Sequence, residues 1–189
     1  GAMKVLDIGP TENFNNDIGP IISKDAFEKL KDYIEAASID GKNVIQPHDY
    51  IDNKYIPPTI IEIESLSELE SEQFGPILHI MKFKAGNIQD VVEEINKLNY
   101  GLTLGVHTRV ESRADEIART ANVGNVYINR DIVGAVVGVQ PFGGEGLSGT
   151  GCKAGGPNYL SQFVNEQVVS KNIVAFGGNT ELLNLQNKE

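Results

Sequence analysis

An alternation of strand-like and helix-like patterns over residues 77–130 is the feature that most constrains the fold of this 189-residue chain. Short apolar runs alternate with segments whose apolar residues have helical spacing, in the order 77–83, 87–98, 102–106, 113–121 and 126–129. Consecutive strands that are joined by helices pair in parallel. We therefore predict an α/β fold with an open, mostly parallel sheet and flanking helices. Residues 77–83 should form a buried strand, and Gly124 should close the helix over residues 113–121.

The region before this alternation predicts one further helix and two strands. Ser23 is a favourable N-cap for a helix to about residue 37, and its apolar stripe consists of Phe27, Leu30, Ile34 and Ala37. Val44-Ile45 is expected to start a short strand, and residues 66–71 a helical turn. Residues 55–64 are rich in β-forming side chains, but Pro57-Pro58 should confine them to a sheet edge or an irregular strand.

The pattern breaks after residue 130. Residues 134–156 contain nine glycines and little periodicity, which predicts a long irregular loop system of the kind that is usually functional or disordered. Residues 162–175 return to a strand-like apolar pattern, and a polar tail follows. We divide the chain into a tag-cleavage scar (1–3), part of a catalytic domain (4–165), a strand suited to oligomerisation (166–175) and a C-terminal tail (176–189).

Composition excludes several classes of function. The formal net charge is −10 and no Lys/Arg-rich run is present, so the sequence does not favour a nucleic-acid surface. Cys152 is the single cysteine, which excludes an intrachain disulfide and a thiolate-based zinc site, and the three histidines are scattered. No apolar stretch approaches the roughly 20 residues of a transmembrane helix.

Gly144–Gly149 matches the G-x-G-x-x-G pattern of a dinucleotide-binding turn. That fingerprint requires a strand directly before it and a helix that opens within it, and neither is expected here. A P-loop match also fails, because Cys152 separates the second glycine from Lys153 and Ala154 replaces the Ser or Thr. Neither pattern therefore predicts a nucleotide site on its own.

Five segments taken together resemble the aldehyde dehydrogenase superfamily. Four of them, 17–22, 72–78, 124–129 and 141–149, match its Asp-x-Gly-Pro-Leu-Ile, Glu-x-Phe-Gly-Pro-[Val/Ile]-Leu, Gly-x-Val-x-[Val/Ile]-Asn and Pro-Phe-Gly-Gly…Ser-Gly motifs. The fifth, 98–102, is close to its Asn-x-x-x-Tyr-Gly-Leu motif. Residues 140–157 look most like the L-glutamate γ-semialdehyde (1-pyrroline-5-carboxylate) dehydrogenase branch. Residues 177–183 resemble the segment just past the dehydrogenase core in bacterial proteins that fuse this enzyme to proline dehydrogenase. In such a fusion the resemblance implies FAD only in the upstream proline dehydrogenase domain.

The resemblance implies a set of binding residues. Glu72 matches the glutamate that accepts hydrogen bonds from the nicotinamide ribose of NAD, and Phe74 the aromatic at the nicotinamide end. By itself this segment reads as a surface glutamate and a core phenylalanine at a turn. Gly134 and Ala135 match the pair whose backbone N–H groups hold the substrate carboxylate, and Phe142 the aromatic on its aliphatic stem.

Other residues of the motifs receive different expectations. Asn129 is expected to brace a loop. Cys152 does not occupy the position of the family nucleophile, which lies upstream of Asp17, as do the NAD-binding domain and the general base. We therefore expect no catalytic residue in this chain, no activity in isolation, and weak or absent affinity for NAD.

The resemblance also suggests partners and location. Residues 167–174 resemble the strand that family members lend to a partner subunit, so we expect a homo-oligomer; the alternative is an ordinary intramolecular edge strand. The expected small-molecule partner is L-glutamate γ-semialdehyde, and the expected location is cytoplasmic, with peripheral membrane association left open for a longer parent protein. The competing hypothesis is a non-catalytic module of the same fold that serves assembly or regulation.

Overall fold

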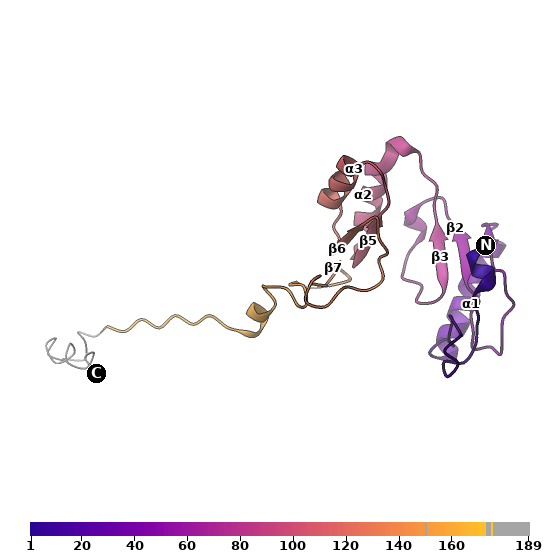
Figure 1. Cartoon of the computed structure of the whole chain (residues 1–189), viewed down its shortest axis with the longest axis horizontal. Helices are drawn as coiled ribbons and strands as arrows, with labels where there is room; N and C mark the ends of the chain where they lie inside the picture. The colour runs from indigo at the N-terminus through magenta and orange to yellow at the C-terminus, as the bar shows by residue number, and fades with distance from the viewer. Residues whose placement is uncertain (150, 173–174, 176–189) are drawn as a thin grey trace.

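The computed structural model describes residues 1–149, 151–172 and 175, and it arranges most of them in two packed units. Each unit has a small sheet and at least one buried apolar cluster. Figure 1 shows the units side by side, with the N-terminus in the first and an extended C-terminal segment leaving the second. A short 3-10 helix, η1 (Ala2–Val5), precedes the first unit.

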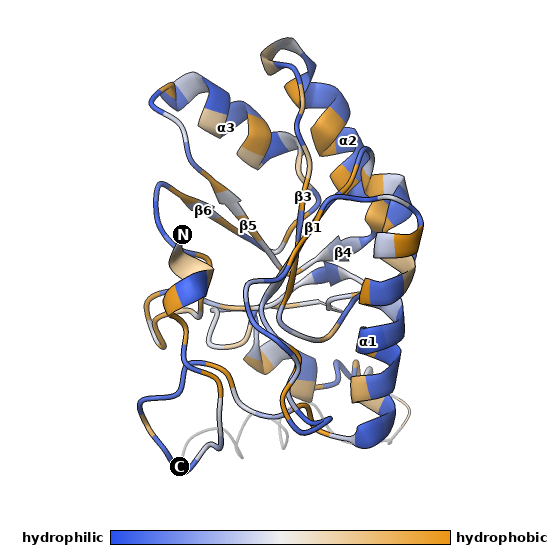
Figure 2. Ribbon diagram, turned by 90° about the vertical axis from the view of Figure 1, so that its right-hand side faces the viewer, coloured by the Kyte–Doolittle hydropathy of each residue, from blue (hydrophilic) through white to orange (hydrophobic). Residues whose placement is uncertain are grey.

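The first unit is built on helix α1 (Lys24–Ile39), which begins at the predicted N-cap. Ser23 Oγ accepts a hydrogen bond from the Ala26 N–H at 3.2 Å. The predicted stripe is buried at all four positions: Phe27, Leu30, Ile34 and Ala37. The stripe packs against a sheet of strands β1 (Val44–Ile45), β2 (Thr59–Glu62) and β3 (Ile77–Ile80). Figure 2 shows apolar and polar residues alternating along the helices, as expected for amphipathic elements.

Strand β2 is the central strand of this sheet, which corrects the predicted edge position. It pairs with β1 antiparallel and with β3 parallel. Pro57 and Pro58 lie just before the paired residues, and the ladder starts where the Thr59 N–H donates to Pro76 O at 2.9 Å. The two missing N–H groups therefore fall outside the ladder, so the prolines do not weaken it.

The second unit consists of α2 (Ile88–Leu98), β5 (Thr103–Val106), α3 (Glu111–Thr120) and β6 (Asn125–Ile128). Strands β5 and β6 pair in parallel across the α3 connection, as predicted. The core of the unit is formed by Val92, Val106, Ala114 and Ile117.

Gly124 does not cap α3, contrary to prediction. The cap position is Ala121, whose backbone is extended (φ −77°, ψ 128°), so the helix ends without a left-handed residue. Gly124 instead starts the approach to β6, where its N–H donates to Gly101 O at 2.9 Å.

Two further strands are β4 (Tyr100–Gly101) and β7 (Glu145–Gly146). In the described part of the chain the strands form three sheets, in the order β1-β2-β3, β4-β7 and β5-β6. Parallel pairing dominates, because β2–β3 and β5–β6 each have four paired positions and the two antiparallel pairs have two each. The α/β class with mostly parallel pairing is thus confirmed. The single open sheet predicted from residues 77–130 is wrong, because β3 pairs with β2 in one sheet and β5 pairs with β6 in another. The strand predicted to be buried at 77–83 differs in two ways: it ends at Ile80, and Leu78 and Ile80 are exposed.

The glycine-rich segment is more ordered than predicted. Strand β7 (Glu145–Gly146) pairs with β4 (Tyr100–Gly101), and Phe142 bridges to Ala154. At Gly124 an added Cβ would lie 1.8 Å from Gly143 O, and at Gly144 one would lie 2.3 Å from Ser148 O. These glycines are therefore required by the close approach of one backbone segment to another.

The described C-terminal part begins with a 3-10 helix, η4 (Leu160–Phe163), where the sequence predicted the start of a strand. Residues 164–171 are exposed and pair with no other described strand. Figure 1 shows them running away from the second unit in an extended course. The oligomerisation strand (166–175) is therefore untested, and positions 173–174 and the tail from 176 lie outside the described residues. Among the described residues, no helix has the length and apolar character needed to cross a membrane.

Candidate functional site

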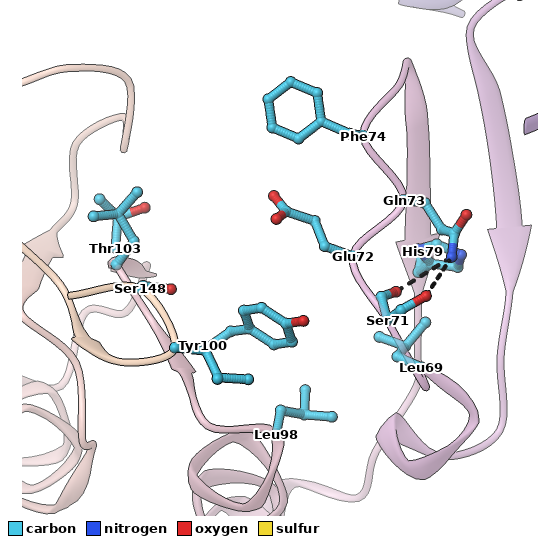
Figure 3. Close-up of a pocket in the computed structure, with 12 residues that line it drawn as sticks. Leu69, Ser71, Glu72, Gln73, Phe74, His79, Leu98, Tyr100, Thr103 and Ser148 are labelled. Carbon is cyan, nitrogen blue, oxygen red and sulfur yellow. Dashed lines mark hydrogen bonds between the residues drawn. The ribbon is translucent and has the colours of Figure 1, made fainter. Parts of the chain in front are cut away.

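A cavity of about 650 Å³ lies between the two units. One wall is the segment between the 3-10 helix η2 (Leu66–Glu68) and β3, together with β3 itself. The other wall comes from β4, β5 and the glycine-rich segment (Figure 3). Its polar lining side chains include Glu72, His79, Tyr100, Thr103 and Ser148. Apolar surface with a few polar groups is the usual composition of a site for a small organic ligand.

Both predicted cofactor residues, Glu72 and Phe74, line this cavity. Figure 3 shows their side chains directed into it from the same segment. Phe74 is 85% exposed, which excludes the alternative in which it is a core residue. The Glu72 carboxylate has no hydrogen bond or ion pair within the described part of the chain, so its oxygens are available to a ligand.

Short local bonds fix the segment that carries these two side chains. Gln73 Nε2 donates to Ser71 O at 3.3 Å and to Ser71 Oγ at 3.2 Å. The Gly75 N–H donates to Gln73 O at 2.9 Å, and the Ile77 N–H to Gly75 O at 2.8 Å. The Gln73 side chain is thus held against Ser71, and the side chains of Glu72 and Phe74 face the cavity.

The opposite wall depends on a left-handed asparagine. Asn99 has φ 59°, a conformation that Asn tolerates better than most residues, and it ends α2. Its carbonyl accepts a hydrogen bond from the Leu147 N–H at 2.8 Å. An added Cβ at Gly146 would come within 2.2 Å of the Asn99 side chain, so only glycine fits there. These contacts place Ser148 at the cavity.

A charged pair lies behind the first wall. Lys42 Nζ donates to Glu68 Oε2, and Glu68 Oε1 accepts from the Ser65 and Glu64 N–H groups at 2.9 and 2.7 Å. The bond from Lys42, together with these backbone donors, lowers the pKa of Glu68 from 4.5 to about 2. The same bond raises the pKa of Lys42. The pair is therefore ionised at neutral pH and closes a capping box on η2.

The three predicted substrate residues do not line this cavity. Gly134 is left-handed (φ 70°), and neither its N–H nor that of Ala135 donates a hydrogen bond to a described residue. The Tyr127 hydroxyl donates to Gly134 O at 3.4 Å. Phe142 is half-buried, and its backbone exchanges hydrogen bonds with Ala154 at 3.1 and 2.9 Å. Their assignment to the substrate stays a prediction.

Two other expectations concern residues outside the cavity. Asn129 braces a loop as predicted: its Oδ1 accepts from the Thr108 N–H and its Nδ2 donates to Thr108 O, both at 3.0 Å. Cys152 is half-buried, and its Sγ accepts a bond from Gln162 Nε2 at 3.4 Å. The G-x-G-x-x-G stretch contains only the two-residue strand β7, and no helix opens within it.

Sequence reasoning missed several lining residues, among them His79, Tyr100 and Ser148. A signal existed for His79, because it alternates with Leu78 and Ile80 and shares the inward face of β3 with Ile77. Tyr100 and Ser148 lie within two of the family motifs, but the motifs did not assign either residue to a site. Both reach the cavity through the β4–β7 pairing, which joins segments more than 40 positions apart.

The fold and cavity define an α/β protein with a candidate small-molecule site between two parallel-strand units. The aldehyde dehydrogenase family model matches residues 1–169, and the chain belongs to this family. Bifunctional protein PutA from Klebsiella aerogenes is 44% identical over 175 residues, which cover 88% of this chain and 13% of that protein. 1-Pyrroline-5-carboxylate dehydrogenase from Staphylococcus saprophyticus is 39% identical over 171 residues, covering 89% of this chain and 33% of that protein.

Solved structures agree with these relatives. The crystal structure of bifunctional proline utilization A (PutA) superposes with a TM-score of 0.83 at 40% identity, covering 93% of this chain and 18% of that chain. A Thermus 1-pyrroline-5-carboxylate dehydrogenase with bound NAD superposes with a TM-score of 0.75 at 34% identity, covering 86% and 31%. The chain therefore spans a third or less of the proteins that it resembles.

Proposed function

We propose that this chain supplies part of the active site of an NAD-dependent dehydrogenase that oxidises L-glutamate γ-semialdehyde to L-glutamate. The observation that carries the proposal is the pair Glu72 and Phe74 on one cavity wall of a chain in the aldehyde dehydrogenase family. The relatives named PutA and 1-pyrroline-5-carboxylate dehydrogenase support the choice of substrate.

The residues of this wall suit a dinucleotide. The unpartnered Glu72 carboxylate can accept hydrogen bonds from two adjacent ribose hydroxyls, and the exposed Phe74 ring offers an apolar face to a planar base. When bound, NAD supplies the acceptor for the hydride that leaves the substrate. Glu72 would orient the ribose, and Phe74 would exclude water from the nicotinamide end.

A second group would hold the substrate. The Gly134 and Ala135 N–H groups, which bond to no described residue, can donate to a carboxylate. The left-handed Gly134 turns the loop there without a side chain in the way. Phe142 would pack on the aliphatic stem. In this proposal the thiolate nucleophile is not Cys152, and the chain alone is inactive.

The sequence of residues 167–174 supports a further part of the proposal, homo-oligomerisation by strand exchange. Residues 167–171 are exposed and have no strand partner within the described part of the chain, and they include the exposed Val168 and Val169. An exposed segment with apolar side chains and no strand partner favours association with a second sheet edge. A cytoplasmic location is proposed with the activity.

The first experiment is an assay of NAD-dependent oxidation of L-glutamate γ-semialdehyde by this chain and by a longer protein that contains it. We expect an active longer protein and an inactive chain. Absence of activity in both would favour a non-catalytic module, and activity in the chain alone would show that the nucleophile has been misplaced.

Variants of the active protein test the residue roles. Glu72→Ala should raise the KM for NAD by roughly tenfold, the worth of a charged hydrogen bond. Glu70→Ala is the control. Glu70 carries the same charge two positions away, is exposed and does not line the cavity, so this variant should leave the KM for NAD unchanged. Equal KM values for the two variants would remove Glu72 from the site.

The substrate loop is tested in the same assay. Gly134→Pro removes an N–H donor and should raise the KM for the aldehyde more than Gly134→Ala, which keeps the donor. Both substitutions disturb the left-handed backbone at this position. An unchanged KM in both variants would contradict the anchoring role.

A further inference from the structure

Helix α1 contacts the cavity wall at two points that flank the start of β3. An added Cβ at Gly75 would lie 2.6 Å from Leu30 Cδ1, so the backbone of the wall rests directly on this side chain. One turn later, the Tyr33 hydroxyl hydrogen-bonds His79 Nε2 at 2.8 Å. Leu30 and Tyr33 are three positions apart and therefore neighbours on one face of the helix.

The Tyr33–His79 contact is made by the rings as well as by the polar atoms. The ring centroids are 5.7 Å apart and the planes are inclined at 77°, an edge-to-face arrangement. His79 is on the inward face of β3 and lines the cavity that holds Glu72 and Phe74. Its imidazole thus connects α1 on one side with the ligand space on the other.

The charges around this contact favour neutral partners. Burial and the positive charge of Lys42 lower the pKa of His79, and the negative charge of Glu68 opposes them. Burial also raises the pKa of Tyr33, so the phenol keeps its proton. These groups come from α1, the turn after it and η2, and Glu72 is the acidic group in the cavity wall itself. The neutral imidazole and the neutral phenol can form this bond with either atom as the donor.

We propose that Tyr33 and His79 form a positioning pair that fixes the Glu72–Phe74 segment for cofactor binding. Their bond holds β3 at a set distance from α1, and Gly75 on Leu30 prevents the segment from tilting about that bond. The role in binding NAD rests on the proposed function, whereas the positioning itself does not.

The positioning is tested in the 189-residue chain by amide hydrogen exchange. Tyr33→Phe keeps the ring and removes the hydroxyl, so exchange at Gly75 and Ile77 should accelerate roughly two- to tenfold, the worth of one neutral hydrogen bond. Tyr50→Phe is the matched control: Tyr50 is a half-buried tyrosine that packs edge-on against Phe27 of α1, on a contact away from β3. Equal exchange in the two variants would overturn the proposal.

The consequence for binding is tested in the active longer protein. Tyr33→Phe should raise the KM for NAD by roughly two- to tenfold with kcat nearly unchanged. His79→Leu should also raise this KM, and His79→Gln, a neutral hydrogen-bonding side chain, should restore part of the affinity.

The two levels of the test separate the hypotheses. If the longer protein does not use NAD, the proposed function fails, and the exchange measurement still decides whether the pair positions the segment. If the longer protein is active and Tyr33→Phe leaves the KM for NAD at the wild-type value, the pair has no role in cofactor binding.

Discussion

Residues 24–80 and residues 131–172 contain similar apolar side chains but use them differently. In the first region the apolar stripe of α1 and the inward faces of β2 and β3 form two connected clusters, and Phe27, Ile56 and Ile61 are 1% exposed or less. In the second region Val137 is 96% exposed, and Val133, Leu160 and Val168 are exposed as well. Apolar content alone therefore does not determine where a core forms.

Residues 131–172 are held in place mainly by contacts of backbone atoms. Gly124 and Gly144 allow main-chain segments to approach more closely than any side chain would permit. Asn125 holds the loop from one side: its Nδ2 donates to Pro141 O at 2.9 Å, and its Oδ1 accepts from the Gly143 N–H at 3.1 Å. The comparison teaches that the first region is stabilised by burial and the second by close packing of glycines and by hydrogen bonds.

The largest expected effect is in the first region. Phe27→Ala should lower the free energy of unfolding by about 3–5 kcal/mol, because it removes a large side chain from the centre of the α1 cluster. Val137→Ala should change it by less than about 0.5 kcal/mol, because that side chain is already in solvent. Urea denaturation of both variants measures the difference, and similar losses would mean that the two regions are not stabilised in different ways.

A smaller effect is expected where glycines decide the structure. Gly124→Ala should cost about 1–3 kcal/mol, because its Cβ collides with a backbone oxygen that has little room to move. Gly86→Ala is the control, since nothing lies within 4 Å of a Cβ at that position. Limited proteolysis of residues 131–172 would show whether the substitution releases the second region, and an unaltered cleavage pattern would contradict this account.

The smallest expected effect is electrostatic and confined to the first region. The pKa of Glu68 is lower in the folded chain than its ordinary 4.5, so the unfolded chain binds more protons as the pH falls. The stability that the Lys42–Glu68 pair contributes is complete above about pH 4.5 and is lost as the pH falls toward about 2. Because both side chains are partly exposed, we expect a contribution of about 1 kcal/mol or less.

Urea denaturation at pH 7 and pH 3 tests this electrostatic contribution. Glu68→Gln should reduce the pH dependence, and Glu70→Gln, a neighbouring exposed glutamate, should retain it. If Glu70→Gln reduced the dependence as much as Glu68→Gln, the specific pair would not be its source.

Periodicity was sufficient to predict the α-helices and the buried face of α1. The four stripe residues of α1 and its N-cap Ser23 are where the sequence indicated, because both signals act within one or two turns of the chain. The family motifs likewise placed Glu72 and Phe74 together, since both belong to one short segment. Residues 134–156 were also identified as a loop system, although the contribution of Leu147 and Ser148 to the cavity wall was not predictable.

The sequence by itself determined the helices, their inward faces, the α/β class and the family. Only the tertiary structure decided that β2 is central, that β3 and β5 belong to different sheets, and that Gly124 serves a backbone contact. It also decided that His79 meets Tyr33, 46 positions away. The physical reason is range: periodicity and caps record which face of an element is buried, whereas strand order and backbone contacts depend on elements that are distant in the chain.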